Sequence, residues 1–198
     1  MPHKTVDYGG RAERSIHIGG VFAASEPTVV ATVLGSCIAV CLRDPKTMTG
    51  GMNHFMLPNA AEGEAASARY GLHAMELLIN ECMRAGADRR RLEAKVFGGG
   101  HVLKIQDSEN SVPRRNIRFA LEFLDTERIP IISQDMGGLV TRKVLFFTDS
   151  GRALLQKMSR NHQAEDSTLE RIRREEQMRL REISQPPAPQ DDSNITLF

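Results

Sequence analysis

Two side chains in the first third of the chain have the types and the spacing that thiol chemistry needs. Cys37 follows a Gly-Ser turn, and His54 lies farther along on another strand-like segment. A free thiol has a pKa near 8.5 and is only about 3% ionised at pH 7, so a nucleophilic cysteine needs a base. An imidazole beside the thiol would be that base, and a third polar group that orients the ring would complete the minimum apparatus for acyl transfer. The hydroxyl of Thr32, just upstream of the cysteine, is a candidate for this third group.

Short apolar segments separated by turns are expected to bring these side chains together. Residues 28–34 are apolar and β-branched, which is typical of a buried strand. Residues 37–43 and 50–57 have the composition of two further strands, joined through a turn at Asp44-Pro45. Neighbouring strands joined in this way could place the thiol and the imidazole within hydrogen-bonding reach.

The Gly35-Ser36 turn is expected to contribute backbone donors to the same site. Such a turn leaves N–H groups unpaired beside the sulfur, and these can lower the pKa of a thiol and later stabilise an oxyanion. Asn53 stands next to the histidine in the sequence. We therefore expect Gly35, Ser36 and Asn53 to hold the oxyanion or to position the substrate.

The same residues also have simpler interpretations. A single cysteine on a strand is far more often a small buried hydrophobe than a nucleophile, and Cys41 and Cys82 are predicted to be core residues. Cys37, Cys41 and His54 could suggest a metal site, but structural zinc normally takes four ligands at tighter paired spacings. We therefore expect no bound metal.

The rest of the sequence alternates between helix and strand patterns. A helical spacing begins at about Tyr70 and ends at Gly86, and Asn116 is expected to cap a second helix. Residues 60–67 are expected to form a surface loop. Further strands are predicted at residues 16–18, 92–97, 129–133 and 143–147. Strands outnumber helices, which predicts a mixed α/β fold.

Composition divides the chain into three regions and limits the classes of function. Residues 1–15 are predicted to be a flexible N-terminus, residues 16–158 a single domain, and residues 159–198 a charged tail that is helical or disordered. The net charge of +1 and the scarcity of aromatic residues argue against nucleic acid as a partner. No apolar run is long enough to cross a membrane, and the start of the chain has no secretory signal. Reduced cysteines in a cytoplasmic protein are therefore expected.

Two strings carry a resemblance to a known family. LGSCIAVCL at residues 34–42, followed by GGMNHFMLP at residues 50–58, closely resembles the signature of the CheD family of chemoreceptor glutamine deamidases. The likeness covers residues 16–158 and continues through RYG, AMELL, KVFGGG, DMGG and RKVLF at residues 69–71, 74–78, 95–100, 135–138 and 142–146. One departure is Thr141, where a glycine is expected.

The resemblance implies a fold and a function. The fold would be a layered α-β-β sandwich of mixed sheets with few helices, similar to the catalytic domain of cytotoxic necrotizing factor. The activity would be hydrolysis of glutamine side chains on methyl-accepting chemotaxis receptors to glutamate, through a cysteine thioester and with no cofactor. The nucleophile falls on Cys37, the base on His54 and the threonine of the family triad on Thr32. The implied partners are the receptors, approached without membrane insertion, and a CheC-type phosphatase.

Two other functions stay open at this point. One is a regulatory binding module that docks on a CheC-type phosphatase or a receptor, with catalysis secondary. The other is a thiol amidase that acts on small metabolites, although the sequence has no obvious small-ligand motif. Cys37 and His54 favour an enzyme, because a pure adaptor has no physical need of either.

Overall fold

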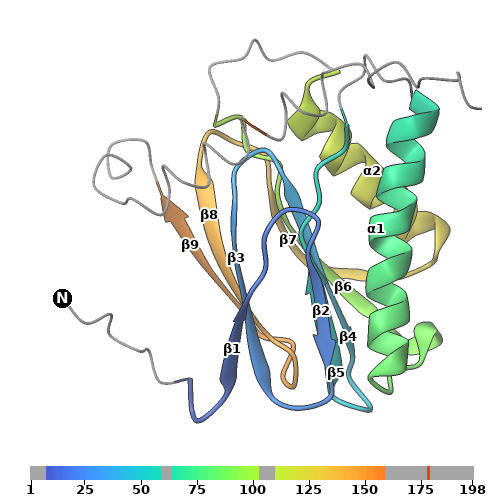
Figure 1. Cartoon of the computed structure of the whole chain (residues 1–198), viewed down its shortest axis with the longest axis vertical. Coiled ribbons are helices and arrows are strands. Elements are labelled where there is room, and N and C mark those ends of the chain that lie inside the picture. Colours follow the sequence, from blue (N-terminus) through green and yellow to red (C-terminus); the bar gives the residue numbers. More distant parts are fainter. Residues whose placement is uncertain (1–7, 59–63, 103–109, 159–177, 179–198) are drawn as a thin grey trace, which may run out of the picture.

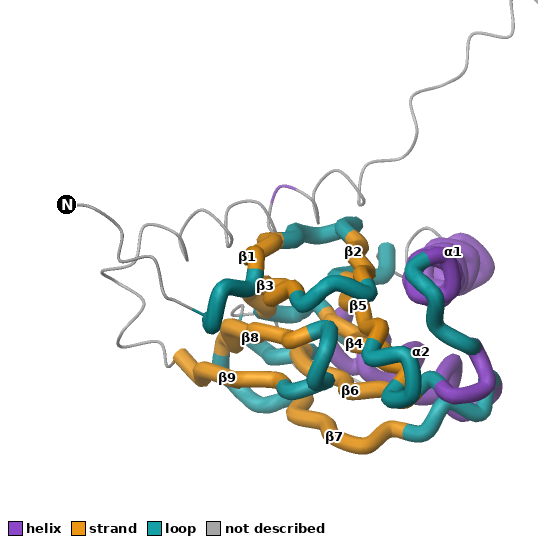
Figure 2. Tube along the Cα trace, turned by 90° about the horizontal axis from the view of Figure 1, so that it is seen from below, coloured by secondary structure: helices purple, strands orange, loops and turns teal. Residues whose placement is uncertain are grey.

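The computed structural model describes residues 8–58, 64–102, 110–158 and Met178. In these ranges two β-sheets lie face to face, and two α-helices cover the outer side of one sheet (Figure 1). Seen from below, the strands form two layers with the helices beyond the second layer (Figure 2). The predicted layered α/β sandwich of mixed sheets is confirmed.

The first sheet has the strand order β1-β3-β8-β9 and consists of β1 (Ala12–Ser15), β3 (Thr28–Leu34), β8 (Thr141–Phe147) and β9 (Ala153–Met158). Strand β1 runs parallel to β3, and the other pairs are antiparallel. The second sheet has the order β2-β5-β4-β6-β7 and consists of β2 (Val21–Ala24), β5 (Thr49–Asn53), β4 (Ile38–Asp44), β6 (Glu93–Gly98) and β7 (Ile131–Met136). Strand β7 is parallel to β6, and the remaining neighbours are antiparallel.

Strands β3 and β4 are consecutive in the chain but belong to different sheets. Residues 35–37 therefore cross from one sheet to the other. This crossing lies at the start of β4, where Cys37 precedes the first residue of the strand. The cysteine is thus held at the junction between the two sheets.

Two apolar cores result, one on each face of the second sheet. Helix α1 (Glu64–Arg84) packs mainly over β2 and β5, and α2 (Val112–Thr126) packs over β4 and β6. Alternate residues of β4 face opposite sides, as the pleat requires. Ile38, Val40 and Leu42 belong to the core under the helices. Cys37, Ala39 and Cys41 belong to the core between the sheets.

Several local predictions are confirmed. Strand β3 has the predicted bounds, 28–34, and β4 and β5 form an antiparallel hairpin around the predicted turn. Gly86 follows the end of α1 with a positive φ of 107°, a conformation that glycine adopts without strain. Cys41 and Cys82 are buried core residues.

Other local predictions are wrong. Residues 16–18 are not a strand but part of the connection between β1 and β2. Helix α1 begins at Glu64, inside the segment predicted to be a loop; alanine and glutamate are strong helix formers. Helix α2 begins at Val112 after Ser111, so Asn116 lies inside the helix and does not cap it.

A strand lies near each end of the main described region, which spans residues 8–158 with gaps. Ala12–Ser15 forms strand β1, within the segment expected to be flexible, and Ala153–Met158 forms β9, which the sequence pattern did not indicate. Residues 159–198, predicted to be a tail, lie outside the described residues except for Met178.

Candidate active site

Cys37 and His54 lie just beyond the ends of the neighbouring strands β4 and β5, on the same face of the sheet. An isolated antiparallel bridge pairs Ile38 with Phe55, extending the β4–β5 register by which Cys41 pairs with Met52. In this register Cys37 and His54 are diagonal neighbours, and side chains in such positions are roughly 7–8 Å apart, measured between backbone positions. Both residues are buried, with exposed fractions of 0% and 3%. The second sheet thus directs both side chains into the space between the sheets.

Thr32 reaches the same space from the opposite sheet. Its hydroxyl oxygen lies 2.8 Å from Nδ1 of His54 and also hydrogen-bonds the backbone oxygen of Ile16, at 2.9 Å. A hydroxyl has one proton to donate, and the Ile16 carbonyl can only accept. The proton between Thr32 and His54 must therefore come from the ring, so Nδ1 carries a hydrogen and Nε2 has the lone pair.

This tautomer is the one that a general base working through Nε2 requires. Within the described part of the chain, Nε2 of His54 is buried and has no hydrogen-bond partner, so no hydrogen bond joins it to the Cys37 thiol. Burial lowers the pKa of His54 to about 3, and the charge of His17 acts in the same direction. The ring is therefore neutral at ordinary pH, with a free lone pair directed into a buried site.

The connection between β1 and β2 fixes the backbone of the histidine. Gly19 donates its N–H to the carbonyl of His54 at 2.7 Å, and the N–H of His54 donates to the carbonyl of Gly20 at 3.0 Å. The same connection contains Ile16, whose carbonyl accepts the Thr32 hydroxyl. One short segment therefore holds both the histidine and the threonine that orients its ring.

The turn that carries the cysteine is held through its carbonyl groups. The carbonyls of Gly35 and Cys37 accept hydrogen bonds from the N–H groups of Gly100 at 2.8 Å and Gly99 at 2.7 Å, and the carbonyl of Ser36 accepts one from the side chain of Asn116 at 2.9 Å. In a trans peptide the N–H points opposite to the carbonyl. The N–H groups of Ser36 and Cys37 consequently point away from the glycine loop and from α2.

Close approach of this turn to residues 98–100 requires glycine. A Cβ atom at Gly98 would lie 2.2 Å from the backbone oxygen of Cys37, and Gly98 has a φ of 115° that side chains rarely adopt. These glycines let the cysteine turn pack against the end of β6.

Asn53 does not join this cluster. Its side-chain oxygen accepts the N–H of Val40 at 3.0 Å, and its side-chain nitrogen donates to the carbonyl of Ala74 in α1 at 3.0 Å. Asn53 therefore faces the helix side of the sheet, opposite to His54. The expectation that it positions substrate is corrected to a structural role that links β4, β5 and α1.

Asn116, which the sequence predicts only as a helix cap, also belongs to this region. Asn116 is fully buried in α2, where it contacts the turn before the cysteine. Asparagine is unfavourable inside a helix, so its presence there signals a tertiary hydrogen bond, but only once the helix boundaries are known.

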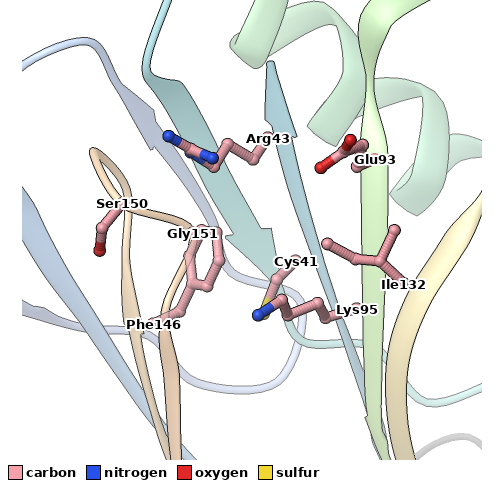
Figure 3. Close-up of a pocket in the computed structure, with 8 residues that line it drawn as sticks. All are labelled: Cys41, Arg43, Glu93, Lys95, Ile132, Phe146, Ser150 and Gly151. Atoms are coloured by element: carbon pink, nitrogen blue, oxygen red, sulfur yellow. The ribbon is translucent and has the colours of Figure 1, made fainter. Parts of the chain in front are cut away.

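A small cleft lies elsewhere, at the other end of the sheets (Figure 3). Its walls include Cys41, Arg43, Glu93, Lys95 and Gly151, and none of the predicted catalytic residues lines it. The Arg43 guanidinium donates to the backbone oxygen of Asp149 at 2.8 Å and 3.1 Å, and these hydrogen bonds join the two sheets at that end. Burial raises the pKa of the Cys41 thiol.

The described residues offer neither a metal site nor a membrane-spanning helix. Among the described residues, no group of three or more His, Cys, Asp or Glu side chains could hold a metal ion. No helix in the same part of the chain is long and apolar enough to span a membrane.

The fold and the site define an α/β sandwich with a cysteine, a histidine and a threonine at the junction of its sheets. A family model described as CheD chemotactic sensory transduction matches residues 56–157. Proteins from Stenotrophomonas maltophilia (strain K279a) and Xanthomonas campestris pv. campestris (strain B100), each named probable chemoreceptor glutamine deamidase CheD, are 50% identical to this chain over 145 residues, covering 73% of this chain and 73% of the relative. A protein of the same name from Bordetella petrii is 49% identical over 142 residues, 71% of this chain and 63% of its own. The chain belongs to the CheD family.

Proposed function

We infer that this protein hydrolyses glutamine side chains of chemoreceptors to glutamate and releases ammonia. Family membership and the names of the relatives support the substrate and the reaction. The observation that carries the chemical part of the proposal is the hydrogen bond between Thr32 and His54, because it leaves the Nε2 lone pair of His54 available on the same sheet face as Cys37.

The mechanism assigns one role to each residue. His54 takes the proton of the Cys37 thiol through Nε2, and the thiolate attacks the side-chain carbonyl carbon of glutamine. The resulting oxyanion accepts hydrogen bonds from the N–H groups of Ser36 and Cys37, which point away from the contacts that hold the turn. His54 returns the proton to the departing nitrogen, so ammonia leaves and a thioester forms. Water, deprotonated by His54, then hydrolyses the thioester to glutamate and the free thiol. No step needs a metal ion or an organic cofactor.

Thiolate formation and the low pKa of His54 are compatible. The neutral ring is favoured while its surroundings are uncharged, because burial penalises the imidazolium. A thiolate formed next to the ring supplies the opposite charge and raises the pKa of His54 during the reaction. Catalytic hydrogen bonds are often long or poorly aligned before substrate binds, and the contact between the Cys37 sulfur and Nε2 is proposed to form when the receptor binds.

Burial of the nucleophile constrains the encounter with substrate. Cys37 has no exposed surface and His54 is 3% exposed, so binding of a receptor must open a path to the sulfur. Once the glutamine side chain is inside, exclusion of water strengthens the electrostatic interactions at the reacting carbonyl. We further propose a cytoplasmic location and, as the family resemblance implies, a CheC-type phosphatase as a second partner.

The proposal is tested by the mass of a substrate. The full-length protein is incubated with the cytoplasmic fragment of a chemoreceptor, and intact masses are measured over time. Each conversion of an amide to an acid adds about one dalton, because NH₂ is replaced by OH. We expect this gain with the native protein and with Cys82→Ala, a change at a buried cysteine of α1, and no gain with Cys37→Ala. A gain with Cys37→Ala would refute the thiol mechanism, and binding of the fragment without any mass gain would favour the binding module.

A further inference from the structure

We propose that Asn116 is a positioning residue that sets the cysteine turn against the segment that follows the histidine. The proposal rests on the proposed function, because it assumes that Cys37 is the nucleophile. It adds a residue from α2, an element that contributes none of the predicted catalytic side chains.

The side chain of Asn116 joins two backbone segments. Its nitrogen donates to the carbonyl of Ser36 at 2.9 Å, and its oxygen accepts the N–H of Leu57 at 2.8 Å. Ser36 directly precedes Cys37, and Leu57 lies three residues after His54. Asn116 is 0% exposed, so water does not compete for either hydrogen bond. A single amide therefore fixes the distance between the nucleophile's turn and the strand end that carries the base.

The same hydrogen bond controls the orientation of an oxyanion donor. The peptide whose carbonyl binds Asn116 also carries the N–H of Cys37, and a planar peptide turns as one unit. The flanking carbonyls of Gly35 and Cys37 are held separately by Gly100 and Gly99. Without the Asn116 donor, the turn stays anchored at both ends while its central peptide can rotate. Loss of Asn116 should therefore affect catalysis more than folding.

The decisive variant is Asn116→Ala, which removes the donor to Ser36 at every pH. Asn116→Asp is a second variant that keeps the size and the acceptor for Leu57; it is assayed at a pH where the carboxylate is ionised, because the protonated acid that burial favours still donates to Ser36. A misplaced nucleophile or a lost oxyanion donor costs roughly tenfold to a hundredfold or more in rate. We expect both variants to lose at least about tenfold in kcat for deamidation of the receptor fragment, with KM changed less than about threefold.

A matched control separates positioning from stability. Leu124 is fully buried in the same helix and packs in the core under the helices, so Leu124→Ala should lower the melting temperature without touching the cysteine turn. We expect this variant to keep kcat within about threefold of the native value at a temperature where it is folded. If Asn116→Ala keeps kcat to the same degree, or loses it only as Leu124→Ala does, the positioning role is wrong.

Two further measurements complete the test. If the Asn116 variants do not fold, a scalar coupling across the hydrogen bond between Nδ2 of Asn116 and the carbonyl carbon of Ser36 is sought by NMR in the native protein, and its absence overturns the proposal. Cys37→Ala is assayed in parallel. Activity in Cys37→Ala refutes the proposed function, whereas an inactive Cys37→Ala with a fully active Asn116→Ala refutes only the role of Asn116.

Discussion

Replacement of Thr32 by valine should slow catalysis while leaving the shape of the site unchanged. Valine matches threonine in volume but has no hydroxyl, so the change removes the contacts to Nδ1 of His54 at 2.8 Å and to the carbonyl of Ile16 at 2.9 Å. Thr32 is 5% exposed, and no cavity forms. The main consequence is a buried ring N–H without an acceptor.

The expected magnitude follows from that unpaired group. Leaving a buried donor unsatisfied costs about 1–3 kcal/mol. Moving the proton to Nε2 does not avoid this cost, because Nε2 is buried and has no hydrogen-bond partner either. The rate falls because the imidazolium formed during proton transfer loses more than the neutral ring does: hydrogen bonds to charged groups are worth about 1.5–3 kcal/mol, and neutral ones about 0.5–1.5 kcal/mol. At about 1.4 kcal/mol per factor of ten, this difference of about 1–1.5 kcal/mol should lower kcat by roughly fivefold to tenfold. The free energy of unfolding should fall by about 1–3 kcal/mol.

The assay compares Thr32→Val with Thr32→Ser, which keeps the hydroxyl. Rates of ammonia release from a receptor fragment give kcat, denaturant unfolding gives the stability, and ¹⁵N chemical shifts of the His54 ring report which nitrogen carries the proton. We expect Thr32→Ser to stay within about threefold of the native rate, since one methyl group is lost and the hydrogen bonds remain. Equal rates for the two variants, or a proton on Nε2 of native His54, would refute the argument.

Three other changes test the surroundings of the site. Gly98→Ala should lower the melting temperature far more than Gly137→Ala, because both residues have positive φ but only the methyl at 98 meets a backbone oxygen, at 2.2 Å; equal shifts in calorimetry would contradict this. Arg91→Met should reduce the free energy of unfolding at neutral pH, since the Arg91 guanidinium holds the pKa of the buried Asp44 carboxyl well below its usual range. That difference should shrink as the pH falls below about 4, where the unfolded chain takes up the proton, and a constant difference would show that the carboxylate is not its source. His54→Gln should remove a pH dependence of stability. Below about pH 6.5 the unfolded native chain binds a proton at His54, whereas the buried ring, with its pKa of about 3, does not, so the native protein should lose roughly 1.4 kcal/mol of stability per pH unit relative to the variant. Parallel curves of stability against pH for the two proteins would argue against the neutral ring.

Local patterns were sufficient to predict the strands that carry the nucleophile and the base. Strand β3 and the β4–β5 hairpin follow from β-branched runs and a short turn, so the common face of Cys37 and His54 was within reach of the sequence. Thr32 was a candidate from its position, but its contact with His54 crosses from one sheet to the other. Strand periodicity says nothing about which sheets face each other.

The two asparagines differ from the sequence predictions for different reasons. Asn53 is adjacent to the histidine, but adjacent residues of a strand face opposite sides, and this rule alone is enough to exclude it from the site. Asn116 fits the pattern of a helix cap, because asparagine favours caps and the sequence does not fix the helix boundary. Its hydrogen bonds to Ser36 and Leu57 depend on tertiary packing of α2 against two distant segments, which no local pattern reports.

The chemistry of the sulfur is open to direct observation. The native protein is mixed with a glutamine-containing receptor fragment, quenched in acid within a turnover, and analysed by intact mass and fragmentation. A covalent adduct is expected with the mass of protein plus fragment less one ammonia, about 17 daltons, localised to Cys37 and absent from Cys37→Ala. Glutamate formation that proceeds in the Cys37→Ala protein, or an adduct on any other side chain, would contradict the account.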